Sequence, residues 1–90
     1  MKKNILITGA SSGIGLATAI KFASTKLYRL IICGRRSNRI NQLAEKLIKD
    51  YGVEVCQLSF DVRNYEECEK AIESLSPPFD KIDILLNNAG

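Results

Sequence analysis

The chain has 90 residues, of which 46% are hydrophobic and 26% are charged, a composition typical of one soluble globular domain. A chain of this length removes only about 60 to 65% of its unfolded surface from water, so we expect marginal stability unless a partner or further chain completes the core. The 13 basic and 10 acidic residues are spread along the sequence, and this balance argues against a nucleic-acid-binding or membrane-binding protein.

The first predicted element is a strand over residues 5–7, a continuous apolar run typical of a strand buried on both faces. From Gly13 the apolar spacing becomes helical. Four residues at intervals of three or four should share the buried face of this helix: Leu16, Ile20, Ala23 and Leu27. A second apolar strand is expected over residues 30–33.

The second predicted helix has the clearest amphipathic pattern in the chain. Its apolar positions are Ile40, Leu43, Ala44, Leu47 and Ile48. Gly52 stands where a left-handed helix cap is expected, and a third strand is predicted over residues 53–58. Asn64 and Glu67 have the spacing of a capping box, which would start a third helix. The apolar side of that helix comprises Cys68, Ala71, Ile72 and Leu75.

Pro77 and Pro78 end the third helix because neither can donate a backbone N–H, and a fourth strand is predicted over residues 82–86. The resulting order is βαβαβαβ. This alternation predicts an α/β, Rossmann-like fold, a parallel sheet with flanking helices and right-handed crossovers, truncated after its fourth strand. An unpaired apolar edge strand invites aggregation, so we expect the isolated 90-residue chain to fold poorly or to associate.

The segment TGASSGIG, residues 8–15, lies between the first strand and the first helix, where a parallel sheet places its ligand crevice. We expect Gly9 to turn the chain off the strand, Gly13 to let backbone approach a ligand, and Gly15 to let the helix pack closely. The amides at the helix start and the hydroxyls of Ser11 and Ser12 suit a pyrophosphate. The alternative is a glycine-rich turn without a ligand, which the position between strand and helix disfavours.

Gly34, Arg35 and Arg36 follow the second strand, where NAD-binding domains carry a carboxylate. A carboxylate would accept a hydrogen bond from the ribose 2′-OH and repel a 2′-phosphate, whereas a guanidinium pairs with that phosphate. The sequence therefore favours NADP over NAD as the dinucleotide. The alternative is a pair of exposed loop arginines that bind nothing.

Two motifs resemble the short-chain dehydrogenase/reductase family, namely TGASSGIG for T-G-x-x-x-G-x-G and the final NNAG for N-N-A-G. The first motif follows the first expected strand and the second ends the chain, with the expected elements between them, so the resemblance covers the whole chain. It implies that residues 1–90 are the N-terminal part of an NAD(P)-binding Rossmann domain, and that the C-terminal catalytic part is absent. Complete members of the family are expected to form homo-oligomers.

The resemblance also implies the residues that contact NADP. The pyrophosphate and ribose would be lined by Gly9, Ser11, Ser12, Gly13, Ile14 and Gly15. Arg35, with Arg36 beside it, would meet the 2′-phosphate, and Asp61 would accept from the adenine amino group with Val62 beside the ring. The adenosine ribose would be bordered by Asn88, Ala89 and Gly90, while Asn87 would be structural. The alternatives are a solvated acid at Asp61 and simple turn residues at Asn87 and Asn88.

The catalytic groups of this family are a Ser, a Tyr and a Lys four residues after the Tyr, all C-terminal to NNAG. Tyr28, Tyr51 and Tyr65 are followed four residues later by Ile32, Val55 and Glu69, so this chain has no Tyr-x-x-x-Lys pair and we assign no catalytic residue. The absence of histidine also excludes a Ser-His-Asp triad.

For the complete enzyme, the resemblance implies hydride transfer between a nicotinamide cofactor and a carbonyl or alcohol substrate, with the Tyr as general acid/base. The 90-residue chain alone is predicted to be inactive, and its substrate stays open. Two alternatives are a non-catalytic nucleotide-binding or interaction module and the remnant of an interrupted gene.

The three cysteines, Cys33, Cys56 and Cys68, lack the CxxC spacing of zinc or redox sites, so we expect buried thiols and no metal site. Buried thiols are typical of the reducing cytosol, and the apolar run near the N-terminus is too short for a signal peptide or membrane span. We therefore expect a cytoplasmic protein. The connection over residues 24–29 lacks the glycine that the family often has there, so its geometry is left open.

Overall fold

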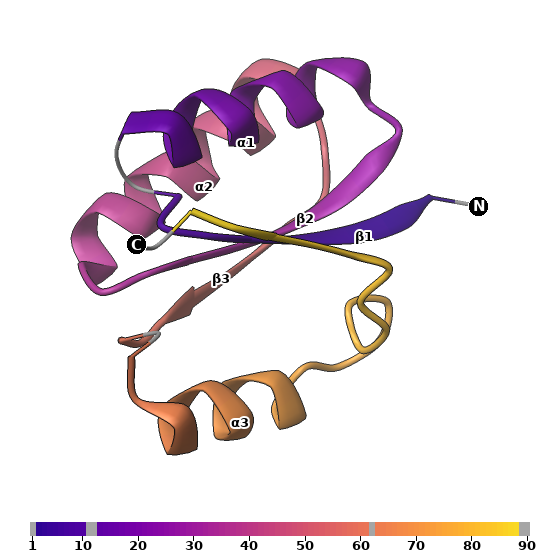
Figure 1. Ribbon diagram of the computed structural model, residues 1–90. Helices are drawn as coiled ribbons and strands as arrows, with labels where there is room; N and C mark the ends of the chain where they lie inside the picture. Colours follow the sequence, from indigo (N-terminus) through magenta and orange to yellow (C-terminus); the bar gives the residue numbers. More distant parts are fainter. Residues whose placement is uncertain (1, 11–12, 62, 89–90) are drawn as a thin grey trace.

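The computed structural model describes residues 2–10, 13–61 and 63–88 (Figure 1). Within these ranges strands and helices alternate in the predicted order βαβαβαβ. The elements are β1 (Lys3–Thr8), α1 (Gly13–Thr25), β2 (Tyr28–Gly34), α2 (Ser37–Tyr51), β3 (Val55–Ser59), α3 (Tyr65–Glu73) and β4 (Ile84–Asn87).

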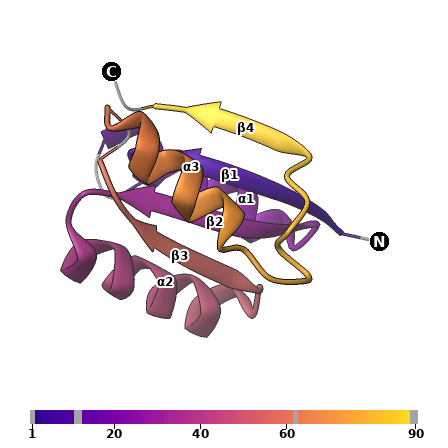
Figure 2. The ribbon, with the colours of Figure 1, turned by 90° about the horizontal axis from the view of Figure 1, so that it is seen from below.

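The four strands form one parallel sheet in the order β3-β2-β1-β4 (Figure 2). In the centre of the sheet Ile5 of β1 pairs with Leu30 of β2 on one side and with Ile84 of β4 on the other. Helices α1 and α2 cover one face of the sheet, and α3 lies on the opposite face (Figure 1). These features confirm the predicted Rossmann-like fold.

Each face of the sheet has its own apolar core, because successive side chains of a strand point to opposite faces. On the side of α1 and α2, four side chains of the central strands pack against both helices. The strand residues are Ile5, Ile7, Leu30 and Ile32, and the helix residues are Ala19, Ala23, Leu43, Ala44 and Leu47. On the side of α3 the buried residues are Leu6, Ile31, Cys33 and Phe60. Burial on both faces explains why β1 and β2 are continuous apolar runs rather than alternating ones.

The predicted buried face of α1 was wrong at its C-terminal end. The helix ends at Thr25, and the side chain of Leu27 lies beyond it and is 65% exposed. Ala23 is buried against the sheet as predicted, and the other buried residues are Gly15 and Ala19, with Leu16 and Ile20 half-buried beside them. Small side chains at every fourth position let α1 approach the sheet closely, which the apolar spacing alone did not reveal.

Other boundaries also differ from the sequence prediction. Strand β3 begins at Val55, and Val53 is a buried residue of the preceding loop, while β4 begins at Ile84 rather than at residue 82. Ile48 and Ile72 lie at the margins of their helix faces and are 48% and 44% exposed.

The predicted caps are present in the structure. Gly52 adopts the left-handed conformation with φ of 67°, and its N–H donates to the carbonyl of Ile48. The Asn64 side chain accepts from the backbone N–H of Glu67 at 3.2 Å, which caps α3. The reciprocal capping-box bond is not formed, because the Glu67 carboxylate accepts from the backbone N–H of Asp61 instead, at 3.3 Å.

The connection from α1 to β2 reaches its turn without the glycine that the family often has there. Lys26 adopts a left-handed conformation with φ of 60°, and its N–H donates to the carbonyl of Ala23 at 3.1 Å. A side chain in this conformation costs about 1 to 2 kcal/mol. The turn therefore stores backbone strain at Lys26.

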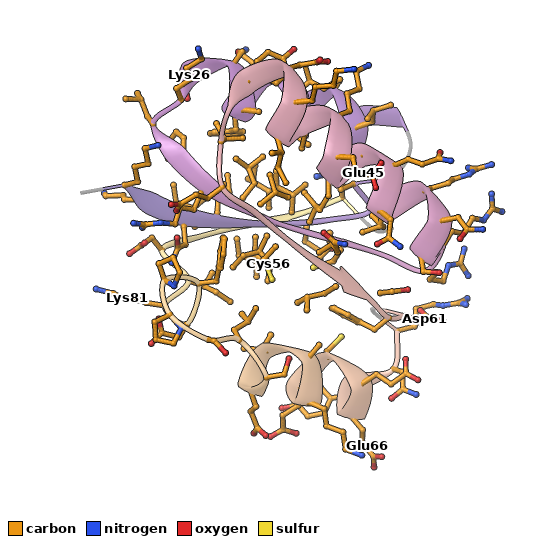
Figure 3. The ribbon with its side chains drawn as sticks, turned by 180° about the vertical axis from the view of Figure 1, so that it is seen from behind. Lys26, Glu45, Cys56, Asp61, Glu66 and Lys81 are labelled. Carbon is orange, nitrogen blue, oxygen red and sulfur yellow. The ribbon has the colours of Figure 1, made fainter. Side chains whose placement is uncertain are left out.

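All three cysteines belong to the cluster between the sheet and α3, where Figure 3 labels Cys56. Cys33 is fully buried, as predicted, whereas Cys56 and Cys68 are half-buried. Burial, with smaller contributions from Cys56 and Cys68, raises the pKa of the Cys33 thiol to about 12. The Cys33 thiol is therefore protonated and unreactive at neutral pH.

In the described part of the chain, no helix has both the length and the apolar character needed to cross a membrane.

Candidate functional site

The predicted site residues follow the carboxyl ends of the four strands. Because the strands are parallel, these ends meet at one edge of the sheet (Figure 2). The glycine turn follows β1, the arginine pair follows β2, Asp61 follows β3, and Asn88 follows β4. The fold thus brings together segments that are far apart in the sequence.

The turn after β1 is built from backbone that only glycine adopts without strain. Gly9 and Gly13 have φ of 61° and 56°, in the left-handed region. A Cβ added at Gly15 would lie 1.9 Å from the carbonyl oxygen of Gly9, so α1 begins in direct contact with the turn. The N–H of Ala10 donates to the carbonyl of Cys33 at 3.1 Å, which fastens the turn to β2.

The start of α1 has the features of an anion site. The first N–H groups of an α-helix have no partner within the helix, and the helix dipole places partial positive charge there. The first turn of α1 contains no acidic residue, and a Cβ added at Gly13 would meet no atom of the described residues within 4 Å, its chain neighbours aside. The backbone of Gly13 therefore borders open space of the kind that a phosphate needs. The Ile14 side chain beside it is 78% exposed.

Arg35 and Arg36 lie where β2 passes into α2, and both are exposed. Arg36 is the N-cap residue of α2, and its carbonyl accepts from the N–H of Ile40 at 3.1 Å. The first turn of α2 contains no acidic residue. Two guanidinium groups and a helix start thus form a second positive region next to the glycine turn.

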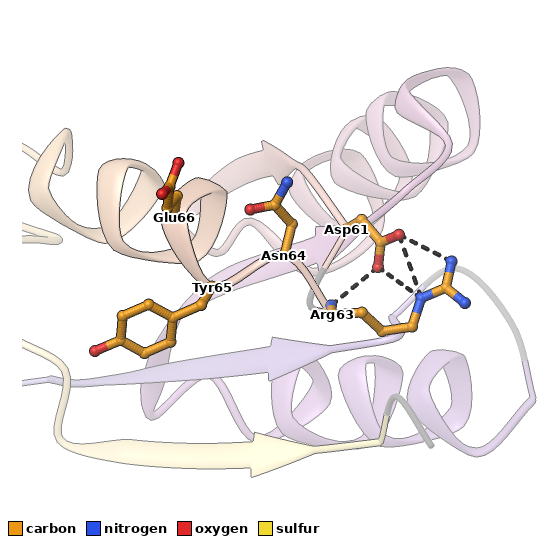
Figure 4. Close-up of a pocket in the computed structure, with 5 residues that line it drawn as sticks. All are labelled: Asp61, Arg63, Asn64, Tyr65 and Glu66. Atoms are coloured by element: carbon orange, nitrogen blue, oxygen red, sulfur yellow. Dashed lines mark hydrogen bonds and ion pairs between the residues drawn. The ribbon is translucent and has the colours of Figure 1, made fainter.

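Asp61, at the end of β3, is held by a residue that the sequence analysis did not single out (Figure 4). Its Oδ1 accepts from the backbone N–H of Arg63 at 2.9 Å, and its Oδ2 accepts from Arg63 Nη2 at 2.9 Å. The side-chain hydrogen bonds from Arg63, followed by the backbone one, lower the pKa of Asp61 to about 2. The recess beside this pair is lined by Asp61, Arg63, Asn64, Tyr65 and Glu66.

Thr8 joins the two sequence motifs. Its buried hydroxyl donates to Oδ1 of Asn87 at 2.7 Å and accepts from the backbone N–H of Asn88 at 3.0 Å. Asn87 thus has a contact within the sheet, and Asn88 is exposed at the site edge. Sequence reasoning missed this role of Thr8, although its place as the first letter of the glycine motif was a signal for it.

Five of the predicted cofactor contacts lie outside the described residues, namely Ser11, Ser12, Val62, Ala89 and Gly90. The others, Gly9, Gly13, Ile14, Gly15, Arg35, Arg36, Asp61 and Asn88, all lie at the carboxyl edge of the sheet.

Residues 3–90 match the family model described as short chain dehydrogenase. The chain belongs to this family. An NADP-dependent 3-hydroxy acid dehydrogenase of Schizosaccharomyces pombe is 44% identical over 88 residues, which cover 98% of this chain and 34% of the relative. A serine 3-dehydrogenase of Agrobacterium fabrum is 42% identical over 90 residues, which cover the whole of this chain and 34% of the relative.

Solved structures of this family superimpose closely on the chain. The L-sorbose reductase of Gluconobacter frateurii, complexed with NADPH and L-sorbose, has a TM-score of 0.91 and 38% identity, with 99% of this chain and 34% of the reductase covered. An alcohol dehydrogenase of Thermococcus sibiricus, complexed with 5-hydroxy-NADP, has a TM-score of 0.87 and 33% identity, with 94% and 36% covered. This short-chain dehydrogenase chain thus spans about a third of the length of the relatives it matches.

Proposed function

We propose that residues 1–90 are the NADP-binding portion of a short-chain dehydrogenase/reductase. In its complete form this enzyme would transfer a hydride between a nicotinamide cofactor and a carbonyl or alcohol substrate. The observation that carries the proposal is the start of α1, where open space at Gly13 lies at the same edge of the sheet as the arginine pair. Relatives that are named as NADP-dependent, or solved with NADPH, support it. When bound, the nicotinamide ring would supply the hydride donor or acceptor.

The chain's own residues would bind and orient the dinucleotide. The amides around Gly9, Gly13 and Gly15, with Ser11 and Ser12, would hold the pyrophosphate, and Ile14 would cover it. Arg35 and Arg36 would pair with the 2′-phosphate. Asn88, Ala89 and Gly90 would border the adenosine ribose.

Asp61 would accept from the adenine amino group in exchange for one of its bonds to Arg63. A carboxylate has about four acceptor positions. Arg63 makes four hydrogen bonds to the carboxylate, two at each oxygen, because its Nε–H is shared between Oδ1 and Oδ2. An exocyclic amine would take the place of the longest of these, the 3.3 Å bond from Nε to Oδ2, with Val62 beside the ring.

The decisive experiment compares two alanine substitutions at glycines with the same backbone strain. Gly13 and Gly52 have φ of 56° and 67°, and an added Cβ meets nothing within 4 Å at either position. Both changes should cost about 1 to 2 kcal/mol of stability for the left-handed conformation. Only Gly13→Ala should weaken NADPH binding, by about tenfold or more, because its Cβ fills the space that the pyrophosphate would approach.

The binding is measured by fluorescence titration of NADPH at a temperature where circular dichroism shows each variant to be folded. A parallel series uses a chimera in which residues 1–90 replace the matching third of the Schizosaccharomyces pombe relative. Equal NADPH affinity of the Gly13 and Gly52 variants would contradict the assignment of the turn. The 90-residue chain alone should show no turnover with any carbonyl or alcohol substrate, and measurable turnover would contradict that prediction.

The preference for NADP is tested at Arg35. Loss of a hydrogen bond to a charged group costs about 1.5 to 3 kcal/mol, so Arg35→Ala should weaken NADPH binding by about tenfold or more. NADH binding should hardly change, since NADH lacks the 2′-phosphate. NADPH affinity that survives the change intact would mean that the 2′-phosphate is held elsewhere.

A further inference from the structure

Asp61 and Arg35 occupy neighbouring strand ends. Strands β2 and β3 are adjacent, with Gly34 paired to Ser59. The pairing continues past the strands, because Phe60 N–H donates to the Gly34 carbonyl at 3.1 Å and Ser59 Oγ donates to the Arg35 carbonyl at 3.5 Å. The charge of Arg35 contributes to the lowered pKa of Asp61, after the larger contributions of Arg63. Arg35 and Asp61 thus follow adjacent strands at the same edge of the sheet.

The position of Asp61 at this edge would oppose the proposed binding of a 2′-phosphate at Arg35. A carboxylate that acts on Arg35 also acts on a phosphate bound to Arg35, and like charges repel. It would compete with that phosphate for the guanidinium as well. An unpaired Asp61 would therefore favour a dinucleotide without a 2′-phosphate.

The Arg63 guanidinium pairs with the Asp61 carboxylate from the solvent side, which offsets the negative charge that would repel the phosphate. Its side chain is 74% exposed, whereas that of Asp61 is 32% exposed. Figure 4 shows the Arg63 side chain folded back so that its guanidinium faces the carboxylate. The backbone bond from Arg63 N–H to Asp61 Oδ1 fixes the carboxylate, and Glu67 and Asn64 hold the Asp61 backbone. Hydrogen bonds of the Asp61 backbone and carboxylate thus position the carboxylate for its pairing with Arg63.

We propose that Arg63 is a specificity-determining residue, which favours a 2′-phosphorylated adenosine by neutralising Asp61 rather than by binding the phosphate. This inference rests on the proposed function, because it requires Arg35 to receive the 2′-phosphate. Arg35, Asp61 and Arg63 would together determine the preference for NADP over NAD.

The test uses adenosine 2′,5′-bisphosphate and adenosine 5′-monophosphate as probes with the 90-residue chain and with the chimera described above. The ratio of their dissociation constants isolates the 2′-phosphate, because adenine contacts are common to both probes. Arg63→Gln should reduce the preference for the bisphosphate by about fivefold, as expected for one unscreened charge at a protein surface. Arg63→Lys, which keeps the charge, should retain most of the preference.

The double variant Asp61→Asn/Arg63→Gln separates neutralisation from direct binding. If Arg63 acts through Asp61, removal of both charges should restore the ratio to within about twofold of the unsubstituted chain. A double variant with a ratio as low as that of Arg63→Gln alone would overturn the proposal, because Arg63 would then act on the phosphate itself. An unchanged ratio in Arg63→Gln would overturn it as well.

Arg29→Gln is the matched control for the change in net charge. Arg29 forms an ion pair with Glu54, and it lies at the amino end of β2, the opposite edge of the sheet. This variant loses the same charge as Arg63→Gln and should keep the ratio. If instead the unsubstituted chain bound both probes with equal affinity, the NADP assignment itself would fail and the role of Arg63 with it. A preference in the unsubstituted chain that persists in Arg63→Gln would refute the role of Arg63 alone.

Discussion

For Gly15→Ala the structure predicts a loss of stability, whereas helix propensity predicts a gain. Gly15 lies in the first turn of α1. In an ordinary exposed helical position, replacing glycine with alanine stabilises by about 1 kcal/mol. At Gly15 the new Cβ would lie 1.9 Å from the Gly9 carbonyl oxygen, 2.7 Å from the Gly9 carbonyl carbon and 3.2 Å from Ala10 Cα.

All three neighbouring atoms belong to the backbone, so no flexible side chain can move aside. A Cβ contact below 3.0 Å is essentially never seen, and relief requires α1 to move from the turn by more than 1 Å. Overpacking of this kind typically costs 1 to 3 kcal/mol, and the backbone clash places Gly15→Ala at about 3 kcal/mol or more. That is a large part of the roughly 5 to 13 kcal/mol expected for a domain of this size.

Urea unfolding followed by circular dichroism measures the effect, with Gly52→Ala as the control for a glycine that has open space. Gly15→Ala should lower the unfolding midpoint more than Gly52→Ala does, and should also weaken NADPH binding because the helix start is displaced. A Gly15→Ala chain as stable as the unsubstituted one would mean that α1 does not begin against Gly9, and the described geometry of the turn would be wrong.

Three further predictions concern the edges of the fold. Lys26→Gly should raise the free energy of unfolding by about 0.5 to 1 kcal/mol, because relief of the left-handed strain exceeds the entropic cost of glycine; a destabilised chain in urea unfolding would contradict this. Asn64→Ala should cost about 1 kcal/mol and speed amide exchange in α3, since Glu67 N–H loses its acceptor; unaltered exchange there would argue against the cap. Pairing with Arg63 lowers the pKa of Asp61 to about 2, below the ordinary value of about 3.9. Ionised Asp61 therefore stabilises the fold above about pH 4, and this contribution is lost as the pH falls toward 2. Urea midpoints of the unsubstituted chain and Asp61→Asn should converge over that range, and a constant difference would count against the ion pair.

The order of elements could be predicted from the sequence because the strongest signals are local. The central strands β1 and β2 are buried on both faces, so their apolar runs are unbroken, and α2 has one apolar stripe that ends at Gly52. The end of α1 could not be predicted in this way. It is set by the turn at Lys26, whose left-handed conformation no residue pattern indicates, and Leu27 therefore falls outside the helix.

The candidate site, too, could be predicted from the sequence only in part. The conformations of Gly9 and Gly13 follow from a turn that only glycine adopts easily, so the glycine spacing was enough to suggest them. The roles of Thr8 and Arg63 depend on contacts that spacing does not encode. Thr8 meets Asn87 because β1 and β4 are paired in register, and the Arg63 guanidinium meets Asp61 because the Arg63 backbone N–H already donates to the same carboxylate.

The contacts of Thr8 explain why two motifs far apart in the sequence occur together. The Thr8 hydroxyl bonds to both Asn87 and Asn88, so the start of the glycine turn is tied to the end of β4. The Ala10 bond to Cys33 and the contact of Gly15 with Gly9 fasten the rest of the turn from the other side. Contacts within the protein therefore hold Thr8, Gly9, Ala10 and Gly15 in place. For this reason Gly15→Ala should reduce stability through a backbone clash, whereas Gly13→Ala should cost only the left-handed strain that Gly52→Ala also costs, and both changes near the turn should weaken NADPH binding.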